Sequence, residues 1–241
     1  MQIATAPAQT QVTGPKLPAP WWHLLLVLAY LIVPFQWWPW ASKMAADLRN
    51  AGRIPLYFIE LEFQWLFLAV VCIGIFFRNG HIRDLVGTLW KSVSEFVRDS
   101  GIGFLFLLAN LAVVMALSPF LSSKGNSHGH DGFLPRNLVE FLAYAPVAIT
   151  AGIGEEIIFR GYLQKMFRSM TGNMGIAIVL QAILFTLAHG YDQSPLGVID
   201  KLLAGIAFGL LANSRKSLLP GIMAHSFIDL FVGFLSAMLM S

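Results

Sequence analysis

The sequence predicts an all-α protein: a polytopic integral membrane helical bundle of about seven transmembrane helices, with eight as the alternative count, plus an amphipathic interfacial helix. Hydrophobic residues make up 56% of the 241 residues and charged residues only 12%, whereas about a quarter of residues are charged in a typical soluble domain. The mean hydropathy is +0.67. Apolar runs of roughly 20 residues, long enough for a helix to cross the hydrocarbon core, recur along the chain. Together these observations exclude an ordinary soluble globular domain.

The charge pattern is typical of a membrane protein and not of a nucleic-acid-binding protein. The formal net charge is only +3, and the basic residues lie mainly between the apolar runs. Basic residues in such loops determine membrane topology. We therefore expect the lipid bilayer, and not nucleic acid, to be a partner of the chain. The single cysteine, Cys72, cannot form an internal disulfide and is expected to pack within its apolar run.

The chain divides into a tail and one domain. Residues 1–20 are rich in Ala, Thr, Gln and Pro and lack the basic start and compact apolar stretch of a signal peptide. We expect them to form a disordered, uncleaved N-terminal tail. Residues 21–241 are expected to form a single transmembrane domain, because the spans use up the remaining length.

Four elements are expected in the first half of the domain. Residues 21–40 form the first span, which ends in a tryptophan cluster typical of an interfacial belt. Residues 56–77 form the second span. Residues 78–100 mix charges with apolar residues at helical spacing, which predicts an amphipathic helix lying at the membrane surface. Residues 101–119 form the third span.

Four further spans are expected after the polar loop 120–137. The fourth runs from residue 138 to about residue 170 and ends at the turn signal Thr171-Gly172-Asn173. The remaining three cover residues 174–190, 196–213 and 218–240. If the spans alternate, ten of the 16 Lys and Arg residues lie on the side of the tail. This bias predicts a cytoplasmic N-terminus and, with seven spans, a C-terminus on the opposite side. We expect the protein in the inner (cytoplasmic) membrane of a bacterium.

The fourth span carries three charged residues in an apolar run: Glu155, Glu156 and Arg160. A charged group at membrane depth costs roughly 2.5–3.5 kcal/mol on insertion scales, so such residues indicate pairing or function. Glu156 and Arg160 are four apart and can pair along one helix face. Glu155 is five residues from Arg160 and is harder to neutralise by it. A structural Glu–Arg pair at a helix end is the alternative interpretation.

Further ionisable residues end or interrupt two other spans: His189 in the fifth, and His225 with Asp229 in the seventh. The turn after the fourth span lies equally far in sequence from Glu155 and His189, so a hairpin places both at one height. A basic residue lies ten positions from Glu155 and another ten positions from His225, which places both about 15 Å from the same membrane border. We therefore expect these side chains to converge, in a site that opens toward this border, the cytoplasmic one.

Such a set of carboxylates and imidazoles is suited to hydrolysis. Glu155 can act as a general base toward a water, and His189 beside it can share or orient the water's proton. His225 can donate a hydrogen bond to the oxyanion of a tetrahedral intermediate. Asp229, one helical turn from His225, can fix the tautomer and orientation of that ring.

These residues resemble the CAAX-protease and bacteriocin-processing (CPBP) family of glutamate-type intramembrane proteases. The family pattern is Glu-Glu-x-x-x-Arg, then Phe-x-x-x-His, then His-x-x-x-Asn or Asp. All three motifs occur here in this order, each in a different span. They lie within residues 138–231, which we take as the catalytic core. They are Glu155-Glu156-Ile157-Ile158-Phe159-Arg160, Phe185-Thr186-Leu187-Ala188-His189 and His225-Ser226-Phe227-Ile228-Asp229.

The resemblance implies an endopeptidase in which Glu155 and His189 activate water, while His225 with Asp229 stabilises the oxyanion. The second glutamate and the arginine of the first motif would support that site. The eukaryotic branch, which cleaves prenylated proteins, more typically has asparagine at the position of Asp229. That difference weakens the case for prenyl-protein cleavage.

The expected function is an intramembrane endopeptidase that hydrolyses a peptide bond in a membrane-associated protein or peptide, as in maturation or removal of a sorting signal. Two alternatives remain open at this point. Intramembrane Glu, Asp and His also mark the pathways of ion- or proton-coupled transporters, although no inverted repeat is visible in the sequence. A non-catalytic immunity or scaffold protein could keep the same bundle. The sequence does not determine the oligomeric state.

No cofactor is expected, with zinc as the lesser alternative. Two glutamates and two histidines could bind zinc. However, the chain has no His-Glu-x-x-His motif, and Arg160 beside the carboxylates would oppose a cation. His128 and His130 lie in a Gly-rich loop that fixes no ligand geometry, so we expect a plain loop there.

Overall fold

The structure, a computed structural model, describes residues 17–32, 47, 52–121, 133–189 and 194–240. Among these residues, the only β-type pairing is an isolated bridge between Gly87 and Ser217. The all-α prediction is therefore confirmed for the part of the chain that the structure describes. Most of the expected tail, the tryptophan cluster at 37–40 and the histidines of the loop 120–137 lie outside the described residues.

The described helices match the predicted spans one by one. Five helical stretches are long and apolar enough to cross a membrane, and two shorter apolar helices accompany them. Each of the seven expected spans coincides with one of these stretches, which confirms a polytopic helical bundle. In chain order the helices are α1 (Trp21–Ile32), α3 (Arg53–Phe76), α4 (Ile82–Val86), α5 (Val93–Leu121), α7 (Leu138–Glu155), the π-helix η2 (Glu156–Leu163), α8 (Gln164–Thr171), α9 (Met174–Ala188), α10 (Pro195–Arg215) and α11 (Leu219–Met240).

Capping residues set the ends of the helices that carry the site. The side chain of Asn137 accepts from the backbone N–H of Glu140 at the start of α7, and Asn173 caps α9 in the same way. Ser194 caps α10, which has Pro195 in its first turn. Such caps satisfy backbone donors that have no partner within the helix. Between α8 and α9 the chain turns at Gly172, whose φ of +70° suits glycine.

The prediction of one continuous amphipathic helix over residues 78–100 is wrong. Helix α4 ends before Gly87, whose φ is +82°, and the next helix, α5, begins only at Val93 and continues through the third span. The break has a physical cause. The backbone around Gly87 pairs with the segment before α11: Thr88 donates to the carbonyl of Lys216 at 3.1 Å, and Leu218 donates to the carbonyl of Val86 at 2.9 Å.

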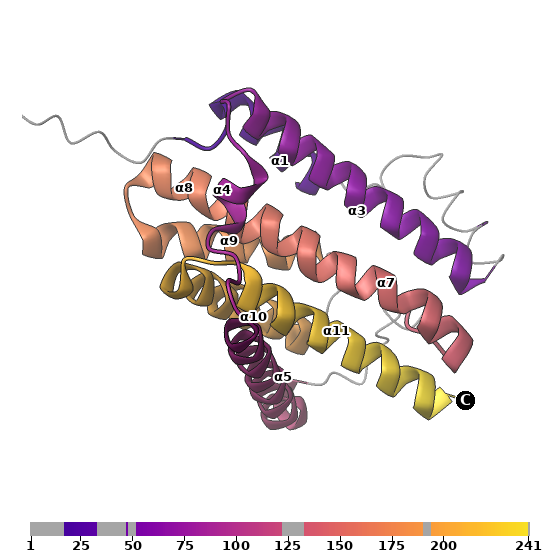
Figure 1. Cartoon of the computed structure of the whole chain (residues 1–241). Coiled ribbons are helices and arrows are strands. Elements are labelled where there is room, and N and C mark those ends of the chain that lie inside the picture. Colours follow the sequence, from indigo (N-terminus) through magenta and orange to yellow (C-terminus); the bar gives the residue numbers. More distant parts are fainter. Residues whose placement is uncertain (1–16, 33–46, 48–51, 122–132, 190–193, 241) are drawn as a thin grey trace, which may run out of the picture.

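The helices α3, α7 and α11 run side by side, and α8 lies at the end of the bundle opposite the C-terminus (Figure 1). A large apolar core lies at the α8 end and includes most of η2 with residues of α1, α3 and α9. A much smaller cluster, formed by Tyr57, Tyr144, Val147 and Ala148, lies between α3 and α7 toward the other end. The site described next lies between these two clusters along α7.

Candidate active site

The first motif lies at a change of helix type. Glu155 is the last residue of α7, and Glu156 begins η2, an eight-residue π-helix. π-helical segments are rare in proteins, and those that occur are often found at functional sites. All eight residues of η2 are buried. Tyr162 at its far end is tied to α1, because its hydroxyl lies 2.7 Å from Nδ1 of His23, whose Nε2 lies 3.0 Å from the carbonyl of Val70 in α3.

Glu156 and Arg160 form a fully buried ion pair. The Nη1 of Arg160 donates to Oε1 of Glu156 at 2.8 Å, and neither side chain is exposed. The guanidinium also lies 4.4 Å from the centroid of the Phe185 ring and 5.1 Å from that of Phe208. Cation–π contacts of this kind stabilise a desolvated arginine. The pairing expected from the four-residue spacing is therefore present.

His225 joins α11 to both glutamates. Its Nδ1 lies 3.3 Å from Oε1 of Glu156. Its Nε2 lies 3.8 Å from Oε2 of Glu155 and 3.6 Å from Oδ2 of Asp229. The ring is stacked on Phe208, with centroids 5.5 Å apart. The hydrogen bond that orients this ring is thus made by Glu156 at Nδ1, whereas Asp229 stands beyond hydrogen-bond distance at Nε2.

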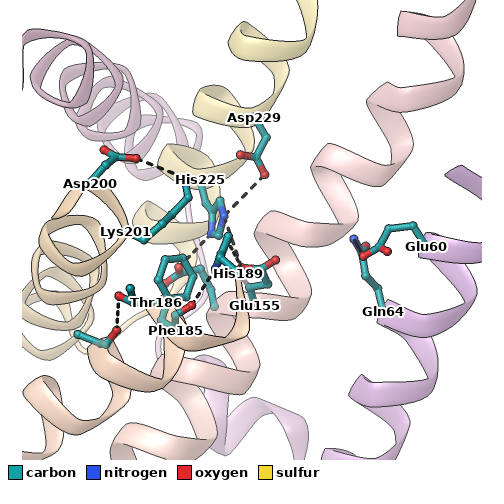
Figure 2. Close-up of polar contacts among 12 residues, drawn as sticks. Glu60, Gln64, Glu155, Phe185, Thr186, His189, Asp200, Lys201, His225 and Asp229 are labelled. Carbon is teal, nitrogen blue, oxygen red and sulfur yellow. Dashed lines mark hydrogen bonds and ion pairs between the residues drawn. The ribbon is translucent and has the colours of Figure 1, made fainter. Parts of the chain in front are cut away.

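His189 lies at the C-terminal end of α9 and faces Glu155. Its Nδ1 donates to the carbonyl oxygen of Phe185 at 2.8 Å, which leaves Nε2 as the acceptor of a neutral ring. That Nε2 lies 3.9 Å from Oε2 of Glu155. Figure 2 shows Glu155, His189, His225 and Asp229 drawn together from α7, α9 and α11.

Glu155 Oε2 is at the centre of this arrangement. It is shielded from solvent, yet it accepts no hydrogen bond from any residue that the structure describes. The two ring nitrogens nearest to it, one from His189 and one from His225, stand at 3.9 and 3.8 Å. Polar atoms at such distances are too far apart for a direct hydrogen bond and suit a bridging water.

The exposed side of the site faces away from the α8 end. Glu155, His189 and Asp229 have 27%, 19% and 28% of their side chains exposed, whereas Glu156 is completely buried. Asp229 lies beyond His225 in the direction of the C-terminus, and η2 packs into the large core on the other side. The expectation that the site opens toward the border of Lys165 and Arg215 is therefore wrong. The large core fills that side.

Sequence reasoning missed one charged neighbour. Lys201 on α10 lies close enough for its charge to act on Glu155, His189 and Asp229. Its Nζ lies 3.3 Å from Oδ2 of Asp200. A lysine within the apolar run 196–213 is a signal of function that the sequence itself carries.

The geometry brings no metal site together. Among the residues that the structure describes, no group of three His, Cys, Asp or Glu side chains is arranged to hold a metal ion. Oε1 of Glu156 is paired with Arg160 and faces His225. Metal-free chemistry and the roles of the six motif residues stay predictions.

Comparison with known proteins gives one family and two relatives. Residues 137–231 match the family described as type II CAAX prenyl endopeptidase Rce1-like, which confirms the resemblance of this region to the CPBP family. The UPF0177 protein YbdI of Lactococcus lactis subsp. lactis (strain IL1403) is 26% identical over 160 residues, which cover 60% of this chain and 78% of that protein. An uncharacterized 24.3 kDa protein of Escherichia coli is 22% identical over 213 residues, 82% of this chain and 91% of that protein. No solved structure matches the chain significantly.

Proposed function

Because residues 137–231 match the Rce1-like CAAX endopeptidase family, we propose that this protein is a glutamate-type intramembrane endopeptidase. Its substrate is a membrane-associated protein or peptide, cut during maturation or removal of a sorting signal. The observation that carries the proposal is the position of Glu155 Oε2, buried and without a hydrogen bond, between the Nε2 atoms of His189 and His225.

The proposed reaction begins with a water held between Glu155 and His189. One hydrogen of the water points to Oε2 of Glu155 and the other to the bare Nε2 of His189, which the Phe185 carbonyl fixes in that tautomer. The water oxygen then attacks the carbonyl carbon of the substrate while Glu155 takes up the proton. General-base catalysis of this kind contributes roughly 10²–10⁴-fold to a rate.

The other motif residues support this step in our proposal. His225, when protonated on both ring nitrogens, donates from Nδ1 to Glu156 and from Nε2 toward the oxyanion. Arg160 keeps Glu156 ionised and in place through the 2.8 Å bond between them. As the tetrahedral intermediate collapses, the carbon–nitrogen bond breaks and the leaving amine takes the proton from Glu155.

The in-cell test compares membranes that carry the wild type, Glu155→Gln or Glu62→Gln. Glu62 is an exposed glutamate of α3 and serves as a matched control for loss of a carboxylate. Mass spectrometry of new N- and C-termini should find cleavage products with the wild type and with Glu62→Gln, and lose them with Glu155→Gln. Identical termini in all three membranes would reject the endopeptidase proposal.

We further propose that catalysis needs no metal. The guanidinium of Arg160 lies within 2.8 Å of Glu156 and would repel a cation near the glutamate pair. Dialysis of the purified protein against a chelator should leave the cleavage rate unchanged. A loss of cleavage activity that only added zinc restores would show that the enzyme uses zinc.

A further inference from the structure

The proposed site has few donors for an oxyanion. A carboxylate accepts hydrogen bonds and cannot donate them when ionised, so Asp229 does not stabilise negative charge on a substrate oxygen. The same holds for Glu156, and the proton that Glu155 takes up is passed on to the leaving amine. Arg160 carries donors, but its side chain is completely buried beneath Phe185 and bound to Glu156. Among the motif residues only His225 can point a donor to the exposed side of the site.

Lys201 brings a positive charge to this exposed side. Its side chain is 28% exposed, as is that of Asp229. Its charge acts on Glu155, His189 and Asp229, the three partly exposed groups around the proposed water. Figure 2 shows Lys201 reaching from α10 toward His225, on the side of the site away from α3.

A chain of contacts from a second helix holds Lys201 in place. The Nδ2 of Asn110 on α5 donates to Oδ1 of Asp200 at 2.7 Å, and Oδ2 of Asp200 lies 3.3 Å from Nζ of Lys201. An ammonium has three donors. One is directed to Asp200, and the others stay available to a substrate oxygen.

We propose that Lys201 is a catalytic residue that stabilises the oxyanion of the tetrahedral intermediate. This inference rests on the endopeptidase function proposed above. When the water oxygen bonds to the carbonyl carbon, the π electrons of the carbonyl move to its oxygen. Lys201 donates a hydrogen bond to that oxygen without losing its proton, and His225 donates a second.

Kinetics with purified protein in lipid vesicles test this role. The probe is a membrane-anchored peptide whose cleavage the in-cell comparison identifies; it carries a fluorophore and a quencher, so that its fluorescence rises on cleavage. Lys201→Met should lower kcat about 10²–10³-fold, the usual loss for one oxyanion donor, and leave KM nearly unchanged. Lys201→Arg should retain part of the activity. Lys91→Met, at an exposed lysine far along the chain from the site, should match the wild type.

A rescue experiment separates catalysis from a structural effect. Asp229→Asn places an amide donor beside His225, so the double variant Lys201→Met/Asp229→Asn should be at least about tenfold faster than Lys201→Met alone. A lysine needed only for folding would not be replaced in this way. Wild-type kcat in Lys201→Met, or no gain in the double variant, overturns the proposal. If Glu155→Gln is also fully active, the proposed function itself fails.

Discussion

At the scale of single residues, the buried charged side chains of the site pair with one another, and one carboxylate oxygen serves two partners. Arg160 neutralises Glu156 at 2.8 Å, and the same Oε1 of Glu156 orients His225. The sequence spacing predicted the Glu156–Arg160 pair because residues four apart share a helix face. It could not predict which ring nitrogen of His225 meets which carboxylate, because that depends on how α11 packs against α7.

The first prediction concerns this ion pair. Arg160→Met should destabilise the protein by about 3–5 kcal/mol, because it leaves the buried carboxylate of Glu156 without its partner. The double variant Arg160→Met/Glu156→Gln should regain much of that loss, since no uncompensated charge remains. Unfolding in a detergent titration measures both variants. Arg83→Met, at an exposed arginine of α4, is the control.

Equal stability of Arg160→Met and the wild type would contradict the assignment of a buried, coupled pair. So would a double variant less stable than either single one.

At the scale of elements, close helix packing positions the two sides of the site. A Cβ on Gly152 of α7 would stand 2.3 Å from Oγ and 2.9 Å from the backbone nitrogen of Ser226 on α11, so glycine permits this approach. The sequence predicted the helices from their apolar runs and turn signals. It could not predict η2, since nothing in residue spacing distinguishes a π-helix from an α-helix. It also missed the break at Gly87, which depends on pairing with a segment about 130 residues later.

The second prediction compares two glycines of α7. Gly152→Ala should destabilise the protein by about 1–3 kcal/mol, because overpacking moves backbones apart. It should also lower activity about 100-fold, the effect of a misplacement of roughly 1 Å between Glu155 and His225. Gly154→Ala meets nothing within 4 Å and should be neutral or stabilising.

Thermal unfolding and cleavage of the labelled membrane-anchored peptide measure both variants in parallel. If Gly154→Ala proved as harmful as Gly152→Ala, the harm would come from the loss of any glycine in α7 and not from the contact with α11.

At the scale of the whole molecule, the site has a sealed end and an exposed end. Basic residues gather at the sealed end, next to the large core; examples are Lys165, Arg168, Arg215 and Lys216. Composition and hydropathy were sufficient to predict the bundle, and residue counting was sufficient to bring Glu155, His189 and His225 to one level. The direction of opening was not predictable, because it depends on where the apolar side chains fill the bundle.

The third prediction concerns orientation. The excess of basic residues at the sealed end predicts a cytoplasmic N-terminus and a C-terminus on the other side. Alkaline phosphatase, which is active only outside the cytoplasm, should therefore be active when fused after Ser241 and inactive when fused after residue 169, next to Arg168. The reverse pattern would show that the exposed side of the site faces the cytoplasm.

The most direct test of the role of Glu155 is the cleavage rate of purified Glu155→Gln in lipid vesicles, with the same labelled membrane-anchored peptide as the probe. The substitution keeps the shape of the side chain and removes its ability to accept the proton of the bridging water. We expect a fall in kcat of about 10²–10⁴-fold, with an unfolding transition like that of the wild type. An unchanged rate in a correctly folded variant would show that Glu155 does not activate the water.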